Sequence, residues 1–361
     1  KKGTIINISA TASSISECIG NIEQQSGLKI KEILVSISGE EVSSTNSVGQ
    51  AAISENEVSA RDIENALNMS STLKIPNDKT LLYVVPISFF IDGQGNIDDP
   101  LGMNGIKLEA RSHLIHCSKN TKDNIKKCLK VSSSGIGIRK YFYSQLGVAH
   151  SVLTDYQKKL GVCILDIGAG TTDISVYQNG SITFSKVLPY AGDYITEIIA
   201  SALDIQSSDA EAIKKKYGSA FSDNINDEML KISVENGKKS ISRKALAGLI
   251  ENSMSKILRH CLNSLEENNL LNNISDGIVI TGGSANMEGM VKLGEKLSNL
   301  NFKIGIPKYN LPRKSDNLIK PENSVILGMT KFYALEQDKE FTFNQSKGII
   351  ARVLEWIRTE L

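Results

Sequence analysis

The stretch from Gly161 to Gly180, GVCILDIGAGTTDISVYQNG, constrains the fold of this chain more than any other part. An apolar, partly β-branched run at 162–165 predicts a buried strand, and alternation over 173–177 predicts a second strand that ends at an Asn-Gly turn. The small residues between them allow backbone N–H groups to gather round an anion. The stretch therefore predicts a phosphate-binding hairpin, with an ordinary glycine-containing hairpin in a core as the alternative.

The polar residues of this stretch suit a nucleotide phosphate with its metal ion. Asp166 stands at the end of the first strand, where its carboxylate could hold a hydrated Mg²⁺ beside the phosphates. Two threonine hydroxyls add hydrogen-bond donors. The predicted phosphate loop consists of Gly168, Ala169, Gly170, Thr171 and Thr172.

A second junction of the same kind lies at 276–290, DGIVITGGSANMEGM. A buried strand at 277–281 leads into Gly282, Gly283 and Ser284, and a helix is expected after them. Ligands of nucleotide-binding α/β domains lie at the carboxyl ends of the strands. The two loops together predict two walls of one nucleotide site, although a tight strand-to-helix turn would also explain the second loop.

Apolar periodicity predicts alternating helices and strands along the rest of the chain. The expected helices span 8–25, 54–69, 120–131, 194–203, 208–216, 243–265 and 325–335. The further expected strands span 32–38, 47–53, 81–86, 89–92, 106–117, 185–189, 228–234 and 239–242, while 135–157 is expected to be helix and loop. The strand at 47–53 is expected to continue the first core, and 54–131 is expected to be a compact unit inserted into it.

Composition excludes several classes of protein. With 361 residues the chain is long enough for two or more domains. Its net charge of +1 does not provide the overall positive charge that attracts nucleic acid. Its five cysteines are scattered without metal-ligand spacing, which fits a reducing interior. No run approaches the ~18 apolar residues of a spanning helix.

The last 14 residues, GIIARVLEWIRTEL from 348, form a separate amphipathic pattern. At about 100° per residue, the apolar side chains fall within an arc of roughly 160°. A helix of this kind, with Trp on its apolar face and Arg beside it, lies in a membrane interface, although a docking or core helix would share the pattern. The expected membrane contacts are Ile349, Ile350, Arg352, Val353, Leu354, Trp356, Ile357 and Arg358. The polar stretch 336–347 is expected to be a linker to this helix.

The motifs together resemble the FtsA family of actin-like bacterial cell-division proteins, within the superfamily of actin, sugar kinases and heat-shock chaperone ATPases. The segments that carry the resemblance are LDIGAGTTDISVYQNGSI, KVLPYAGDYIT, SDAEAIKKKYG, GIVITGGSANMEGM and the tail. The resemblance implies an α/β, actin-like ATPase fold of two duplicated halves with mixed sheets. It divides the chain into subdomain 1A (1–53 and 132–165), the inserted subdomain 1C (54–131), subdomain 2A (166–203 and 276–335), subdomain 2B (204–275), the linker (336–347) and the tail helix (348–361).

The resemblance also implies ATP between the halves, with Mg²⁺ held through water by Asp166 and the phosphates against the loop and Gly192. It implies that Glu211 and Lys214 reach the ribose and base, that Gly282, Gly283 and Ser284 form the adenosine wall, and that Met287 lies against the base. Gln145 is a weak candidate for positioning water, since the family has small residues there and is at most a weak ATPase. The family's first phosphate hairpin, D-x-G-T, is absent, and we interpret the chain as starting after its place.

The implied function is a polymerising adaptor that anchors the FtsZ ring to the membrane through the tail and helps to recruit later division proteins. Its implied partners are the FtsZ C-terminal tail (at 204–275), further copies in a filament, and the anionic inner-membrane surface, with no nucleic acid. Its implied location is peripheral, on the cytoplasmic face of the bacterial inner membrane at the septum. The alternatives are a pilus-assembly actin-like adaptor, which lacks the lipid helix, and a small-molecule kinase, for which no catalytic carboxylate is evident.

Overall fold

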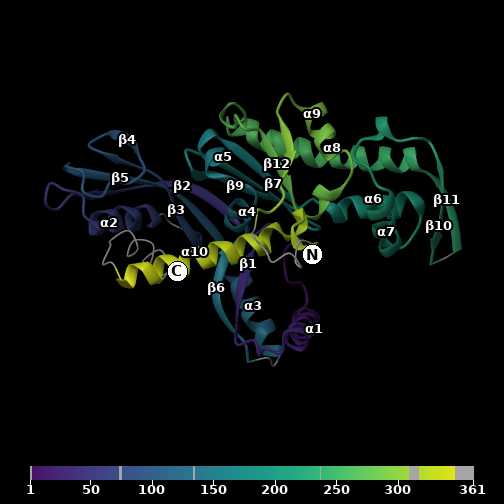
Figure 1. Ribbon diagram of the computed structural model, residues 1–361, viewed down its shortest axis with the longest axis horizontal. Coiled ribbons are helices and arrows are strands. Elements are labelled where there is room, and N and C mark those ends of the chain that lie inside the picture. Colours follow the sequence, from purple (N-terminus) through teal and green to yellow (C-terminus); the bar gives the residue numbers. More distant parts are fainter. Residues whose placement is uncertain (1, 73–74, 133–134, 236, 309–316, 346–361) are drawn as a thin grey trace.

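The computed structural model describes residues 2–72, 75–132, 135–235, 237–308 and 317–345. Its centre is a five-stranded mixed sheet of order β13-β12-β7-β8-β9 (Figure 1). β13, β12 and β7 run parallel, whereas β7, β8 and β9 form an antiparallel meander. The strands span Val162–Ile167 (β7), Thr172–Gln178 (β8), Ser181–Leu188 (β9), Ile278–Thr281 (β12) and Phe302–Ile304 (β13). The predicted hairpin is confirmed, and its turn places Asn179 and Gly180 at φ 51° and 90°.

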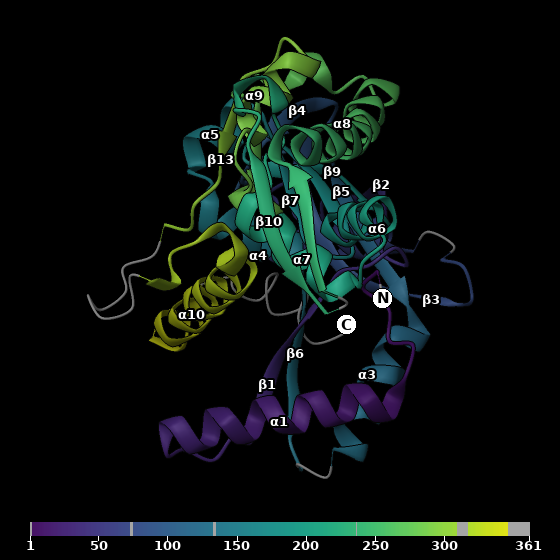
Figure 2. The ribbon, with the colours of Figure 1, turned by 90° about the vertical axis from the view of Figure 1, so that its right-hand side faces the viewer.

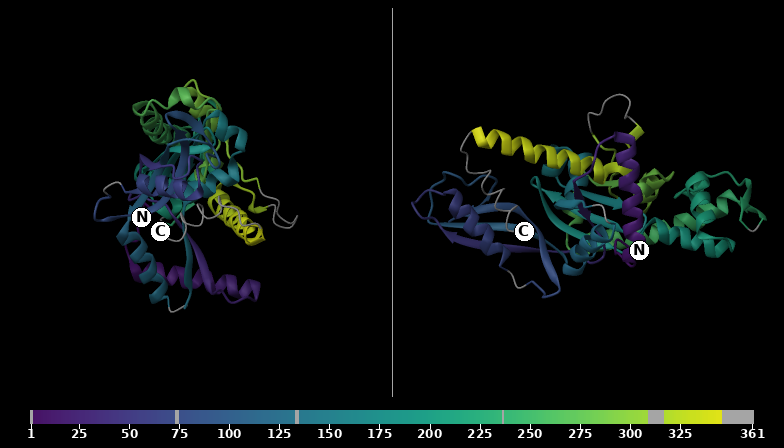
Figure 3. Two further views of the ribbon diagram at one scale, coloured as in Figure 1. Left: turned by 90° about the vertical axis from the view of Figure 1, so that its left-hand side faces the viewer. Right: turned by 90° about the horizontal axis from the view of Figure 1, so that it is seen from below.

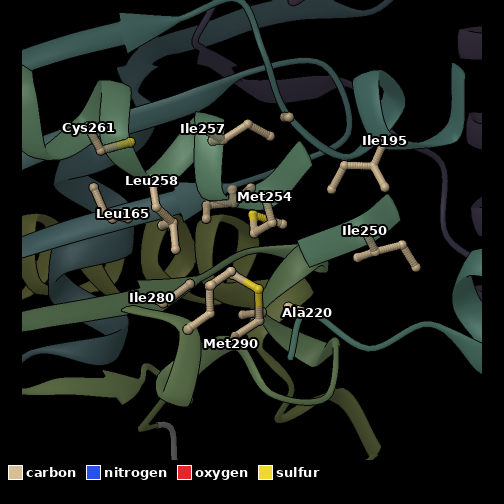
Figure 4. Close-up of a cluster of buried hydrophobic side chains, with 14 of the residues drawn as sticks. Leu165, Ile195, Ala220, Ile250, Met254, Ile257, Leu258, Cys261, Ile280 and Met290 are labelled. Carbon is tan, nitrogen blue, oxygen red and sulfur yellow. The ribbon is translucent and has the colours of Figure 1, made fainter. Parts of the chain in front are cut away.

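Helices cover both faces of this sheet, as the continuous apolar run of β7 requires. Leu165 faces a core formed with α6, α8 and α9, which Figure 4 shows in close-up. Val162 and Ile164 face the opposite side, where α4 packs. The helices span Ser144–Val152 (α4), Asp155–Leu160 (α5), Gly192–Leu203 (α6), Ser207–Tyr217 (α7), Arg243–Glu267 (α8), Met290–Leu297 (α9) and Ser324–Gln345 (α10).

A second, four-stranded antiparallel sheet of order β2-β5-β3-β4 lies beside the edge strand β9. Its elements span Ser43–Ala52 (β2), Ala60–Ser71 (α2), Lys79–Ile91 (β3), Gln94–Ile97 (β4) and Lys107–Ser118 (β5). Helix α2 begins with a capping box between Ser59 and Asp62. It packs so closely on β2 that a Cβ at Gly49 would lie 2.0 Å from the Ala66 carbonyl oxygen.

This sheet corrects four expectations. β2 pairs with β5 throughout its length, so the predicted start of the inserted unit at 54 is wrong and the strand does not continue the first core. The two strands expected at 81–86 and 89–92 are one strand, β3, with a register irregularity between Pro86 and Ser88 where proline lacks a ladder donor. The strand β4 lies between the strands expected at 89–92 and 106–117, where no strand was expected.

A third, smaller layer consists of the parallel pair β1 (Glu32–Ile37) and β6 (Gly137–Tyr143) with α1 (Ile8–Ser26) and α3 (Lys119–Val131) (Figure 2). β6 corrects the expectation of only helix and loop at 135–157. The sequence placed α3 in the inserted unit, but α3 packs against α1, with the Cys128 thiol 3.7 Å from the Ile8 carbonyl oxygen. Outside these corrections, the division into subdomains stays a prediction.

The β10–β11 hairpin and helix α10 complete the fold. The strands expected at 228–234 and 239–242 are present as the antiparallel pair β10 (Met229–Val234) and β11 (Gly237–Ser242). α10 runs from the central sheet towards the inserted sheet (Figure 3). It continues through Gln345, so the linker predicted from 336 is wrong over 336–345, a segment free of Gly and Pro and rich in helix formers. The predicted tail helix lies outside the described residues, among which no helix could span a membrane.

Candidate nucleotide site

Three of the predicted site residues meet at Gly168, in the loop between β7 and β8. The Gly168 carbonyl oxygen accepts hydrogen bonds from the Gly192 N–H (3.1 Å) and the Ser284 hydroxyl (3.2 Å). Gly192 begins α6, and Ser284 follows β12. The phosphate loop, the start of α6 and the second small-residue loop are therefore brought together, as the sequence predicted.

Gly282 shows how tightly the second loop lies against the first. A Cβ at this position would lie 2.4 Å from Asp166 Oδ1 and 2.7 Å from the Ile167 carbonyl oxygen, and the residue has φ +83°. Its neighbour Gly283 has no atom within 4 Å of a corresponding Cβ. Gly282 is needed for contact between the loops, whereas Gly283 faces open space that a ligand could occupy.

Glu211 and Lys214 lie beside the start of α6. Lys214 Nζ is 2.6 Å from Glu211 Oε2 and donates to the Gly192 carbonyl oxygen (2.9 Å) and to the Thr196 hydroxyl (2.7 Å). Burial raises the pKa of Glu211, but hydrogen bonds from Lys214 and Thr196 outweigh it and lower the pKa to about 2. Glu211 is therefore ionised, and Lys214 is connected to the phosphate loop through Gly192, whose N–H donates to the Gly168 carbonyl oxygen.

Gln145 lies in the first turn of α4 and is fully buried. Its amide nitrogen donates to Asp166 Oδ2 (3.2 Å), and its amide oxygen accepts from the Ser175 hydroxyl (3.3 Å). The weak catalytic candidate is thus in contact with the predicted metal-binding carboxylate.

Asp173 is a site residue that the sequence reasoning missed. It pairs with Asp166 in the β7–β8 register, and its carboxylate accepts from the Ser38 hydroxyl (2.7 Å) and the Thr171 hydroxyl (3.1 Å). Burial, and then the charge of Asp166, raise the pKa of Asp173 to about 7. Burial also raises the pKa of Asp166 to about 6, against the hydrogen bond from Gln145. The sequence could have indicated this role, because residues paired across a hairpin point to the same face and Asp173 is expected opposite Asp166.

This carboxylate pair fits a hydrated cation. Two buried carboxylates raise each other's pKa unless positive charge compensates them, and carboxylate oxygen is the ligand that Mg²⁺ prefers. No cluster of three metal-binding side chains was found in the described part of the chain. The pair would therefore share the metal with water and phosphate oxygens.

We predict that Asp173→Asn stabilises the protein at pH 8 and flattens its pH dependence. A carboxyl whose folded-state pKa is raised contributes stability below its unfolded pKa of 3.8, and this stability is lost as pH rises through about 7. Asparagine keeps an oxygen acceptor without the charge, so a gain on the order of 2 kcal/mol is expected at pH 8. Urea unfolding at pH 4, 6 and 8 measures the free energy of unfolding. An equal change of this free energy with pH in both proteins would contradict the prediction.

The other predicted residues of the phosphate loop contact the residues around the start of α6 and the N-terminal residues, and Met287 lies elsewhere. The Thr172 hydroxyl donates to the Tyr190 carbonyl oxygen (2.7 Å), and the Ala169 carbonyl oxygen accepts from the Asp193 N–H (2.7 Å). A Cβ at Gly170 would lie 3.0 Å from the Lys2 backbone nitrogen. Met287 lines a pocket of about 250 Å³ with Phe221 and Glu288, whose lining does not include Glu211 or Lys214.

Comparison with known proteins assigns the chain to a family. The family described as "Cell division protein FtsA" matches residues 163–328, and "SHS2 domain inserted in FTSA" matches 39–116, which agrees with the start of the inserted sheet. The cell division protein FtsA of Pseudomonas aeruginosa is 35% identical over 94% of this chain and 81% of its own length. The chain belongs to the FtsA family of cell division proteins. FtsA of Escherichia coli is 30% identical over 99% of the chain and 86% of its own length.

Solved structures confirm the actin-like fold. A PilM–PilN type IV pilus biogenesis complex matches with a TM-score of 0.62 at 14% identity, over 91% of this chain and 86% of that one. MreB5 of Spiroplasma citri bound to ADP matches with a TM-score of 0.57 at 18% identity, over 96% of this chain and 80% of that one. At these identities the likeness shows the fold alone, while the FtsA relatives give the family.

Proposed function

We propose that this FtsA-family chain is an ATP-binding, polymerising division protein that links the FtsZ ring to the membrane. The observation that carries the proposal is the contact of the phosphate loop, the start of α6 and the Gly282–Ser284 loop around Gly168. Three small-residue segments that meet at strand ends can surround a phosphate with backbone donors. The ADP-bound MreB5 structure of the same fold supports a nucleotide in this place.

In this proposal Asp166 and Asp173 hold hydrated Mg²⁺, which would neutralise phosphate charge. The ionised Glu211 accepts from the ribose, and Gly283 leaves room for the adenosine. Gln145, which is hydrogen-bonded to Asp166 and Ser175, is the weak candidate for positioning water in a site that is at most a weak ATPase. Titration calorimetry of the chain with ATP and Mg²⁺ tests binding, and heats equal to buffer dilution would reject it. A coupled ATPase assay with sugars tests the kinase alternative.

Polymerisation, membrane attachment and recruitment of later division proteins complete the proposal. Family membership supports self-association, and the amphipathic sequence at 348–361 supports a peripheral position on the inner membrane at the septum. Pelleting of the chain with and without ATP tests the polymer. The pilus-adaptor alternative has support from fold likeness at 14% identity, whereas relatives at 30–35% identity favour division.

The FtsZ C-terminal tail is proposed to bind to the 204–275 region, in a groove that α8 of this region forms with the neighbouring helix α9, which lies outside it. Lys256 and Arg259 of α8 and Lys296 of α9 line this groove, and Leu293 and Leu297 form its apolar wall. Lys296 is partly neutralised, since it pairs with Glu251 at 2.9 Å. Basic side chains over an apolar wall suit a peptide that carries both acidic and apolar residues.

We predict that Lys256→Glu combined with Arg259→Glu weakens binding of an FtsZ C-terminal tail peptide about tenfold or more, because two attractive charges become repulsive. Fluorescence anisotropy with a labelled peptide measures the dissociation constant. Lys231→Glu on β10 is the control, because it reverses an exposed charge in the same region but outside the groove. Equal weakening by the control would mean that only overall charge matters.

A further inference from the structure

The first residue of α8 connects two parts of the molecule that the proposed function treats separately. The Arg243 guanidinium lies 3.5 Å from Glu288 Oε2 and 3.2 Å from Glu228 Oε1. The Arg243 N–H also donates to the Glu228 carbonyl oxygen (2.9 Å). Glu228 precedes β10, and Glu288 follows the proposed adenosine wall. One side chain therefore joins the nucleotide loop to the base of the β10–β11 hairpin.

The loop that carries Glu288 is tied to the phosphate loop by consecutive contacts. The Ser284 hydroxyl donates to Gly168, and the Ser284 carbonyl oxygen accepts from the Met287 N–H (3.2 Å). The Glu288 carbonyl oxygen accepts from the Ala220 N–H (2.7 Å). A ligand that shifts Ser284 or Met287 would move Glu288 relative to α8, because the loop between them has only a few residues.

The Arg243 side chain has capacity for a second bond to this loop. Its Nε is buried and has no hydrogen-bond partner among the described residues. Arginine offers several donors in a planar fork and often binds a carboxylate through two of them. A small approach of Glu288 could therefore change a single long contact into a two-point contact, which lysine cannot reproduce.

We propose that Arg243 is a positioning residue that transmits nucleotide occupancy from the adenosine wall to the β10–β11 hairpin. The proposal rests on the proposed ATP binding and adds a route by which ATP regulates the region proposed for the FtsZ tail. Both glutamates are more than half exposed, at 55% and 61%, so solvent screens the pairs and the effect should be modest.

Hydrogen–deuterium exchange of the full chain, with and without ATP and Mg²⁺, tests this route. In the unchanged protein, ATP should slow exchange at 168–172 and should also slow it about two- to fivefold at 229–242. In Arg243→Lys and in Glu288→Gln, the protection at 168–172 should persist while that at 229–242 is lost. Arg243→Lys keeps the positive charge, and Glu288→Gln keeps the shape of the side chain. Arg243→Ala is a more severe third variant, and circular dichroism checks its folding.

Arg139→Ala is the matched control. Arg139 also pairs with an exposed glutamate, Glu32, at 3.2 Å, but it lies on β6 in the α1–α3 layer. It should leave both protected regions unchanged. Protection at 168–172 without protection at 229–242 in the unchanged protein, or equal hairpin protection in the Arg243 and Glu288 variants, overturns the coupling alone. No protection at 168–172 in the unchanged protein overturns ATP binding itself.

Discussion

Gly282→Ala is expected to destabilise the protein by about 2–6 kcal/mol and to abolish measurable ATP binding. Part of the cost, about 1–3 kcal/mol, comes from a backbone conformation with φ +83° and ψ 176° that is almost restricted to glycine. A similar amount comes from overpacking, because the new Cβ would lie 2.4 Å from Asp166 Oδ1. Asp166 cannot easily withdraw, since it is buried and Gln145 donates to its other oxygen.

Gly283→Ala provides the matched control for stability. The substitution is the same and lies one residue away, but its Cβ would meet no atom within 4 Å and its φ is not positive. Its effect should be within about 1 kcal/mol, and slight stabilisation is possible because alanine restricts the unfolded chain. Urea unfolding compares the two variants, and titration with ATP follows for each one that folds. Equal stability of both variants would refute the tight contact between the loops.

The parts of the fold that could be predicted are those set by residues close in sequence. The apolar run of β7, the turn at Asn179 and Gly180, and the capping box at Ser59 and Asp62 each depend on fewer than ten neighbouring residues. The same holds for the two small-residue loops. Their meeting at Gly168 could be predicted because ligand-binding loops gather at the carboxyl ends of strands.

The parts that were missed depend on distant partners. The strand expected at 47–53 was assigned to the first core, whereas β2 belongs to the inserted sheet, because β5 pairs with its largely polar sequence, SSTNSVGQAA, and Gly49 leaves room for α2. Among the described strands, β6 pairs only with β1, about a hundred residues away, so no neighbouring turn in the sequence indicates it. Asp173 was missed for a related reason, since its role depends on its cross-strand position opposite Asp166 rather than on the loop motif.

The tail at 348–361 differs from all of these elements because its predicted partner is a lipid surface. Its pattern places Trp356, Ile357 and Leu361 on one face and Arg352, Arg358 and Thr359 on the other. A single interfacial helix of this kind binds reversibly, and several copies on one polymer bind much more strongly. Membrane attachment should therefore depend on both the apolar face and assembly.

Deletion of 348–361, or Trp356→Glu, is expected to abolish sedimentation of the protein with anionic liposomes. The glutamate replaces the largest apolar side chain of the tail by a carboxylate. Burying this charge in the apolar part of the interface costs free energy, which favours release of the helix into water. Thr359→Glu is the matched control, because it adds the same charge near anionic lipid but on the polar face, and it should retain most of the binding. Liposome sedimentation at fixed ATP and salt measures the bound fraction. If Trp356→Glu and Thr359→Glu bind equally, charge alone governs attachment, and if the deletion still sediments with liposomes, another surface holds the membrane.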